Sequence, residues 1–202
     1  MTLIKELATT GFFKYVEDDA QLQFLFQTLQ QNLEDESMLY FPKKSYYYDV
    51  ALKQRWTGTG NSLEYRTCEV DAEGMLRGGL LAGLTAIKEL FEKRNLKFEF
   101  KNESLGWKED RSSYIKHEIE INNKKYTIAD GDFDRAGGSL HYLRQVEKVI
   151  NEELLLQGSN ERAYKVVSDY GERIWYVIME PIHFDIFERN KDEFSASQLI
   201  KE

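Results

Sequence analysis

A histidine and an aspartate lie near opposite ends of the segment 115–134, IKHEIEINNKKYTIADGDFD, in which apolar and charged residues alternate. The alternation predicts two β-strands, and Asn122 and Asn123 suit a two-residue turn between them because Asn tolerates a positive φ. In this register His117 and Asp130 lie on the same apolar face, with their Cβ atoms about 5–8 Å apart. At that distance we expect the two side chains to contact each other. A histidine beside a carboxylate can act as a general base.

The predicted hairpin has one apolar face and one charged face. The apolar face would hold Ile115, His117, Ile119, Ile121, Tyr126, Ile128 and Asp130, and the charged face would hold Lys116, Glu118, Glu120, Lys125 and Thr127. A four-residue loop keeps this division and places His117 directly opposite Asp130, whereas a three-residue loop would mix the faces. Asp130 is then at least partly buried and needs a hydrogen-bond donor, which His117 can supply.

Cys68 is the only cysteine of the chain and therefore the only candidate for a nucleophilic thiol. The order of Cys68, then His117 on one strand, then Asp130 across a hairpin resembles transglutaminase-like proteins of the papain-type fold. The resemblance implies a cysteine-dependent hydrolase or transferase in which Cys68 attacks, His117 acts as base and Asp130 orients the histidine. The chain departs from that family because its helix is expected to begin at least three residues after Cys68, and because acidic residues at 69, 71 and 73 disfavour the thiolate.

Three aspartates at alternate positions, Asp130, Asp132 and Asp134, begin like a calcium loop of the EF-hand type. Such a loop needs Gly at its sixth position and Glu at its twelfth, and this chain has Arg135 and His141 there. Two interpretations remain: the aspartates hold a metal, or they form the turn and the helix cap that follow the strand. We favour the second, and expect no metal and no cofactor.

Aromatic residues offer a candidate partner-binding patch in the segment SYYYDVALKQRW, residues 45–56. Strand alternation places Tyr46 and Tyr48 on the same face, with Trp56 at the end of the segment. These rings either pack in the core or at a sheet edge, or contact a partner, because Tyr and Trp are enriched at protein interfaces.

The net charge of −8 and the pI near 5.1 bear on the class of partner. Nucleic-acid binding requires Lys and Arg to neutralise phosphates, so an acidic chain without a basic run argues against DNA or RNA. A basic protein would instead be attracted. The single cysteine suits a reducing compartment, the N-terminal segment has no long apolar core, and no run approaches 18 apolar residues, so we expect a cytoplasmic protein that spans no membrane.

The remaining patterns predict an α+β fold: a mainly antiparallel sheet of hairpins with helices packed on one face. We expect a single globular domain over residues 1–202, with a helical N-terminal segment at 2–36, a loose tail at 191–202 and, as an option, two similar ββαβ-type halves at 45–107 and 113–180. The expected elements are helices at 2–9, 19–35, 73–94, 139–156 and 181–190, a strand at 96–107, and hairpins at 45–70, 113–133 and 161–180.

Acidity, tyrosine-rich strands and the lack of a complete catalytic set favour a non-catalytic intracellular binding protein. An inhibitor or immunity-type protein that masks a basic protein partner would have these traits. The alternative is the cysteine-dependent hydrolase or transferase that uses Cys68, His117 and Asp130.

Overall fold

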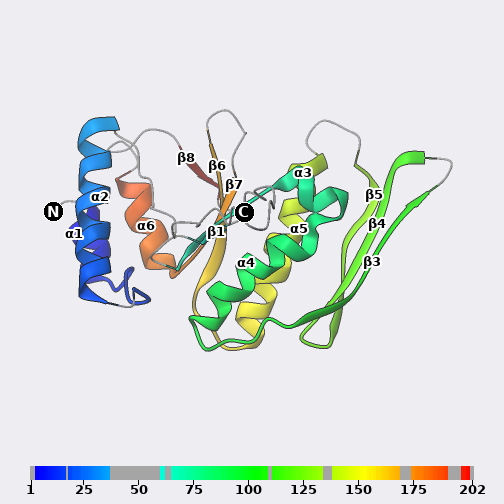
Figure 1. The fold of residues 1–202 in the computed structure, drawn as a ribbon, viewed down its shortest axis with the longest axis horizontal. Coiled ribbons are helices and arrows are strands. Elements are labelled where there is room, and N and C mark those ends of the chain that lie inside the picture. Colours follow the sequence, from blue (N-terminus) through cyan, green and yellow to red (C-terminus); the bar gives the residue numbers. More distant parts are fainter. Residues whose placement is uncertain are drawn as a thin grey trace, which may run out of the picture. The chain divides into compact units, whose positions relative to one another are not determined.

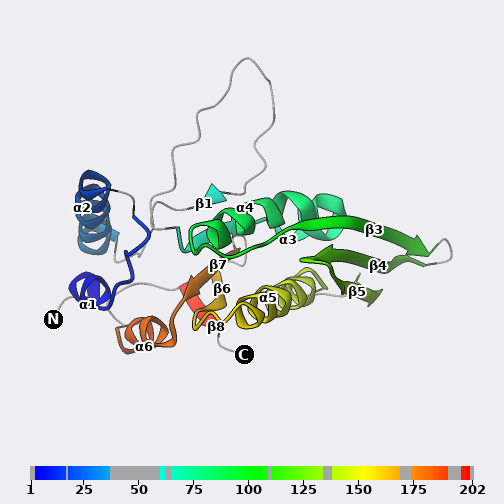
Figure 2. The same cartoon turned by 90° about the horizontal axis from the view of Figure 1, so that it is seen from below.

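The computed structural model describes residues 3–16, 18–36, 60–61, 65–108, 111–133, 138–168, 174–190 and 197–200. The chain forms two compact units, unit 1 from Met1–Val70 with Asn160–Glu202, and unit 2 from Asp71–Ser159 (Figures 1 and 2). Each unit contains its own antiparallel sheet and its own helices, which confirms the α+β class. The two similar halves expected at 45–107 and 113–180 are not confirmed, because the two units have other boundaries. The single globular domain over 1–202 stays a prediction.

The sheet of unit 1 has the strand order β1-β2-β7-β6-β8, and every pairing is antiparallel. The strands are β1 (Gly60–Asn61), β2 (Thr67–Val70), β6 (Arg162–Ser168), β7 (Ile174–Met179) and β8 (Ser197–Ile200). The hairpin predicted over 161–180 is confirmed as β6 and β7. β2 pairs with β7 on one side and with β1 on the other, while the partner expected for it, 45–56, lies outside the described residues. Part of the expected tail forms β8, which pairs with β6.

Three helices complete unit 1 at the positions that the apolar periodicity predicts: α1 (Leu3–Thr9), α2 (Asp19–Glu36) and α6 (Pro181–Arg189). The carboxylate of Asp18 accepts a hydrogen bond of 2.7 Å from the backbone N–H of Gln21, as a helix cap does. Leucines and phenylalanines of these helices form one core with residues of β6 and β7. Its members are Leu3, Leu7, Phe12, Phe13, Leu25, Leu29, Tyr164, Val166, Val177, Met179, Phe184, Ile186 and Phe187.

A buried ion pair lies inside unit 1. Arg66 is completely buried, and its Nη1 is 2.6 Å from Oε1 of Glu161, which is also buried. The guanidinium also donates to three backbone carbonyls, those of Ile178 at 3.0 Å, Gly11 at 3.3 Å and Phe12. A buried charge is tolerated only when its donors are used in this way, so one side chain ties the segment after α1 to the sheet.

Replacing Arg66 with Met is expected to destabilise unit 1 by about 3 kcal/mol, because Glu161 would lose its buried counter-charge and keep only the partly exposed Lys14, 3.7 Å away, and the Tyr15 hydroxyl. The matched control is Arg77→Met, which removes an ion pair to Glu73 whose side chains are 71% and 69% exposed. That change should cost less than about 1 kcal/mol. Urea unfolding of the full chain, with hydrogen exchange of unit 1 amides, measures both, and equal losses would contradict a structural role for Arg66.

Unit 2 consists of a three-stranded sheet and the helical segments before and after it. The sheet order is β3-β4-β5, with β3 (Phe100–Lys108), β4 (Arg111–Ile121) and β5 (Lys124–Asp132) all antiparallel. The helices α4 (Leu80–Glu92) and α5 (Gly138–Leu156) lie on the same side of this sheet in Figure 1. Among the described residues, no helix combines the length and apolar character needed to cross a bilayer.

The continuous helix predicted over 73–94 is wrong in its first third. The segment contains α3 (Ala72–Gly74), a π-helical turn η1 (Met75–Gly79) and then α4, with non-helical angles at Arg77 and Gly78. Gly78 has a φ of +104°, and a Cβ at that position would lie 3.4 Å from Leu105 of β3. The kink therefore depends on glycine for its left-handed backbone, whereas the space beside Gly78 would accept a Cβ in ordinary contact with Leu105.

The β4–β5 hairpin has the predicted two-residue turn. Asn122 and Asn123 have φ values of 49° and 66°, and Ile121 pairs directly with Lys124. Ile119 lies opposite Tyr126, as the alternation predicts. The prediction fails only further from the turn, at the residues with candidate chemistry.

Candidate functional site

His117 lies on the inner face of β4 and is completely buried. Its Nε2 is 2.9 Å from Oε1 of Glu103 on β3, and its Nδ1 is 2.8 Å from the hydroxyl of Tyr142 on α5. Both ring nitrogens are therefore engaged, and the histidine links two strands to a helix.

A β-bulge separates His117 from Asp130. His117 pairs with Ala129 while Glu118 pairs with Thr127, so Ile128 is one extra residue in β5. An extra residue reverses which face the following side chains take. Asp130 accordingly pairs with Lys116 and is exposed.

The predicted contact between His117 and Asp130 is therefore wrong. The carboxylate of Asp130 accepts a hydrogen bond from the hydroxyl of Tyr114 instead, on the charged face of the sheet. This hydrogen bond raises the pKa of the Tyr114 phenol. All other residues assigned to the two faces of the hairpin have the predicted burial: the inner ones are buried, and the outer ones are exposed or half-buried.

A second bulge, in β3, places Glu103 beside His117. Lys101 pairs with Glu120 and Ser104 pairs with Glu118, so two residues of β3 face one residue of β4. Asn102 takes the left-handed conformation of such a bulge, with a φ of 53°. No alternation pattern marks Glu103 as an inward residue, and Asn102 is the one local signal for the bulge.

The side chains of Glu103, His117 and Tyr142 form hydrogen bonds with one another. Burial raises the pKa of Tyr142 above its ordinary value, and the nearby carboxylate of Glu103 raises it further. The phenol therefore stays protonated, and its hydroxyl shares a hydrogen bond with Nδ1 of His117 while Nε2 of His117 shares another with Glu103. The set links β3, β4 and α5 through these two hydrogen bonds.

The other residues with predicted roles belong to different units or lie outside the described residues. Cys68 lies in β2 of unit 1 and is completely buried, whereas His117 and Asp130 belong to unit 2. Asp132 is exposed, and Asp134 lies outside the described residues. Among the described residues, no group of three side chains that could hold a metal ion occurs. Tyr46, Tyr48 and Trp56 also lie outside the described residues.

The charged face of the sheet carries alternating cations and anions. Glu118 is 3.1 Å from Lys125 and 3.4 Å from Lys116, and Glu120 is 3.1 Å from Lys101. A hydrogen bond from Lys125 lowers the pKa of Glu118, so this carboxylate stays ionised at neutral pH. Each exposed ion pair of this kind contributes little to the free energy of unfolding, and together the pairs make this face of the sheet hydrophilic.

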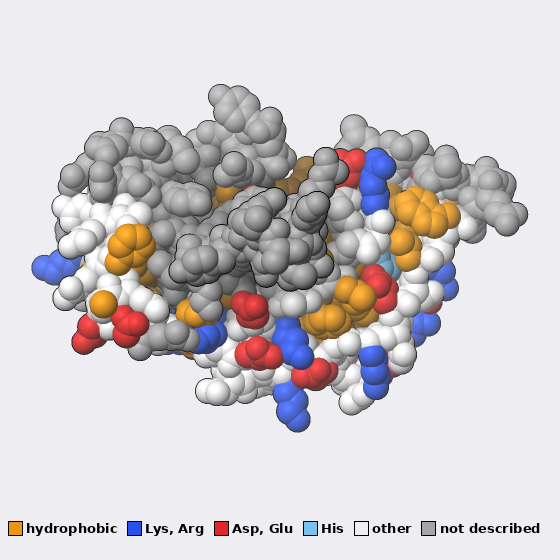
Figure 3. All heavy atoms as spheres, viewed as in Figure 1, with side chains coloured by type: hydrophobic (Ala, Val, Ile, Leu, Met, Phe, Trp, Pro, Cys, Tyr) orange, Lys and Arg blue, Asp and Glu red, His pale blue; other side chains and the backbone are white. Residues whose placement is uncertain are grey.

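The outer half of β3 exposes apolar side chains at the edge of the sheet. We call residues 104–108 the β3 edge. Trp107 is 49% exposed and Leu105 is half-buried, although both pair with inward-facing residues of β4. In Figure 3, hydrophobic side chains gather on the face of unit 2 that carries β3. Trp107 lay at the end of a predicted strand, and only its exposure in the structure marks it as a candidate contact residue.

Comparisons of the chain with protein-family models, with curated proteins and with solved structures found no match. The two candidate features for a function are therefore those of the chain itself: the buried set around His117 and the exposed β3 edge.

Replacing Asp130 with Asn is expected to change the free energy of unfolding by less than about 0.5 kcal/mol, because Asp130 lies on the exposed face. Replacing His117 with Ala should cost about 2–4 kcal/mol, because Glu103 and Tyr142 would lose a shared buried partner. Urea unfolding of the two variants measures this difference. If Asp130→Asn were as destabilising as His117→Ala, the register with the bulge would be wrong.

Cys68 is expected to react slowly with iodoacetamide in the native protein and rapidly in denaturant, because its side chain is completely buried. Alkylation followed by mass spectrometry at several pH values measures the rate, with free cysteine as the control. Fast native alkylation that His117→Ala abolishes would restore the cysteine-dependent alternative.

Proposed function

We propose that this chain is a non-catalytic binding protein that masks a basic protein partner, as an inhibitor or immunity-type protein does. The observation that carries the proposal is the exposure of Trp107 at the β3 edge. Tryptophan is among the residues most enriched in binding hot spots, and an exposed one on a rigid strand can enter a partner's pocket at low entropic cost.

The backbone of β3 supports the same proposal. β3 is an edge strand of its sheet, so one side of it offers backbone N–H and C=O groups to a neighbouring strand. Its first half is protected by the bulge at Asn102 and by charged neighbours, as edges usually are. In its second half, Leu105, Gly106 and Trp107 form an uncharged stretch that ends at a register shift and at Lys108.

Charge favours a basic partner. The chain has a net charge of −8, and Asp130 and Asp132 are exposed at the end of β5 in the same sheet. Complementary charge accelerates association and makes it sensitive to salt. Cys68, buried and without a disulfide, suits a reducing compartment, so we place the complex in the cytoplasm.

The cysteine-dependent alternative lacks one of its three parts. Asp130 does not contact His117, and both nitrogens of His117 are held by Glu103 and Tyr142. Binding therefore accounts for the described residues better than covalent catalysis does.

Trp107→Ala is expected to abolish partner retention, because the variant removes the ring that the β3 edge exposes. Trp107 pairs with the buried Ile115, so thermal unfolding of the variant is measured beside retention to show that it is folded. The chain is immobilised and exposed to native lysate at low and at high salt, and the bound proteins are identified by mass spectrometry. A basic protein should be retained at low salt, weakened at high salt and lost with Trp107→Ala. With purified components, this variant should weaken binding by about 2 kcal/mol or more.

The matched control is Leu155→Ala, which removes an apolar side chain of α5 that is 61% exposed. It should leave retention unchanged. Retention that does not depend on Trp107, or the absence of any basic partner at low salt, would overturn the proposal.

A further inference from the structure

His183 of α6 is completely buried in unit 1, and only one of its two ring nitrogens has a hydrogen-bond partner among the described residues. Its Nε2 lies 3.0 Å from the backbone carbonyl of Thr10, in the segment 10–12 that follows α1. A carbonyl oxygen can only accept, so Nε2 carries the proton of the neutral ring and Nδ1 carries none. One N–H donor of the imidazole therefore joins α6 to the segment 10–12.

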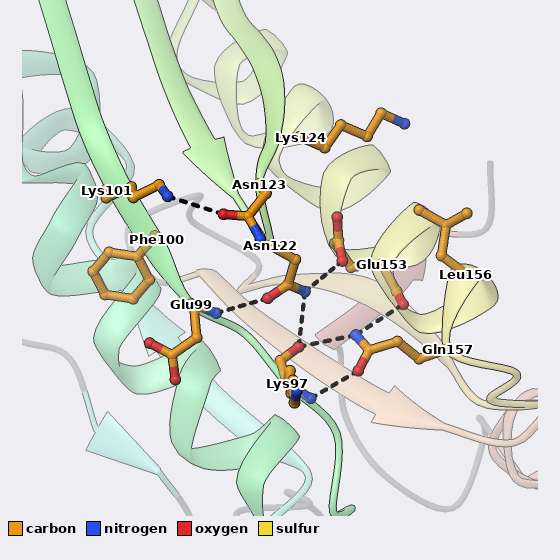
Figure 4. A pocket seen from close by; sticks show the side chains of 10 residues that line it. All are labelled: Lys97, Glu99, Phe100, Lys101, Asn122, Asn123, Lys124, Glu153, Leu156 and Gln157. Carbon is orange, nitrogen blue, oxygen red and sulfur yellow. Dashed lines mark hydrogen bonds between the residues drawn. The ribbon is translucent and has the colours of Figure 1, made fainter.

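The second nitrogen of His183 differs from the buried polar groups of unit 2. Glu153, for example, accepts a hydrogen bond of 2.6 Å from the amide of Asn122 (Figure 4) and another of 2.6 Å from the hydroxyl of Tyr126. Nδ1 of His183 has no such partner within the described part of the chain. Protonation would add an N–H donor and a positive charge at this nitrogen, and a buried donor or charge without a partner is costly.

Two features of the surroundings also oppose a positive charge on His183. The residue is the third of α6, and the N–H groups in the first turn of a helix carry a partial positive charge. Its ring contacts Phe12 edge-on, with centroids 5.3 Å apart, and the guanidinium of Arg66 lies 4.8 Å from the centroid of the same Phe12 ring. Burial lowers the pKa of His183, the hydrogen bond to Thr10 opposes this in part, and the charge of Arg66 lowers the pKa further.

The carboxylates of the same region are paired with other cations. Glu161 lies 2.6 Å from Arg66, and Glu180, the residue before α6, lies 2.8 Å from Nζ of Lys14. Lys14 is also 3.7 Å from Glu161, so two cations already face two anions, and neither anion hydrogen-bonds Nδ1 of His183. The other titratable groups of α6 and of the segments packed on it are Tyr15, whose hydroxyl donates to Glu161, Tyr164, which stacks on Phe184, Glu6, which pairs with Arg189, and the exposed Lys5, Asp185 and Glu188.

We propose that His183 is an acid-sensitive latch, which holds α6 on the segment 10–12 while its imidazole is neutral and releases it when the imidazole is protonated. The same segment accepts hydrogen bonds from Arg66 at the carbonyls of Gly11 and Phe12, so its displacement would also remove acceptors from the buried guanidinium. The latch lies in unit 1 and uses no residue of the β3 edge, so it goes beyond the proposed binding function and is tested apart from it.

Acid should therefore weaken unit 1 through His183. Because burial makes the pKa of His183 lower in the folded chain than in the unfolded chain, the unfolded chain binds the additional proton more readily. The stability that this residue contributes is complete above the ordinary histidine pKa of about 6.5 and is lost as the pH falls below it. One additional proton raises the equilibrium constant for unfolding by up to about tenfold per pH unit in that range.

The test measures hydrogen-exchange protection factors of the α6 amides in the full chain at about pH 7.5 and at about pH 5.5. Protection should fall about tenfold more in the wild-type protein than in His183→Gln, because glutamine does not titrate and its amide can still donate to the carbonyl of Thr10. The matched control is His141→Gln, which removes an exposed histidine of unit 2 and should keep the wild-type loss in α6.

A second measurement uses the wild-type protein alone and decides the question even if His183→Gln fails to fold. The ring resonances of the three histidines are followed by NMR during acid titration. The His183 resonance should stay that of a neutral ring below the ordinary pKa of about 6.5, and should change only together with the loss of the native α6 amide signals. Protonation of His183 near that pKa with unchanged α6 signals, or an equal acid loss of protection in wild type and His183→Gln, would overturn the latch.

Discussion

Two β-bulges, one on each side of β4, determine which side chains reach the interior of unit 2. The extra residue in β3 brings Glu103 to His117, and the extra residue in β5 turns Asp130 outward. Because side chains alternate strictly along a strand, one inserted residue changes the surroundings of all that follow. His117 and Asp130, which the sequence suggested as a catalytic pair, therefore lie apart: His117 packs in the interior and Asp130 lies at the surface.

Burial is costly for a polar group without a partner, and most of the residues that could take part in chemistry are hydrogen-bonded or ion-paired inside the units. Arg66 is matched with Glu161, His117 with Glu103 and Tyr142, and Glu153 with Asn122 and Tyr126. Removing one member of such a set leaves the others unsatisfied, so the sets resist change in the way structural networks do. Reactivity needs a group that can change partner, and these groups cannot do so without opening the core.

Periodicity predicted the helices α2 and α5 and the inner face of the β4–β5 hairpin, Pro181 predicted the start of α6, and Asn122 with Asn123 predicted the hairpin turn, because each of these depends on residues near in sequence. The bulges, the break at Gly78 and the pairing of β2 with β7 depend on strands distant in sequence, which alternation alone does not encode. Of the candidate site residues, His117 was correctly placed on the inner face, whereas Glu103 and Tyr142 could not be identified before the register was known. The exposure of Trp107 is likewise a property of the folded edge.

Net charge and local charge lead to different conclusions about what binds where. The total of −8 acts over the whole surface and attracts a basic macromolecule, yet salt screens exposed charges beyond about 8–10 Å. Within that distance a partner experiences only the charged side chains near it, and on the open face of the unit 2 sheet Glu118 lies between Lys116 and Lys125, so that the charges there offset one another. The attraction of a basic partner would therefore depend on where it binds as well as on the total charge.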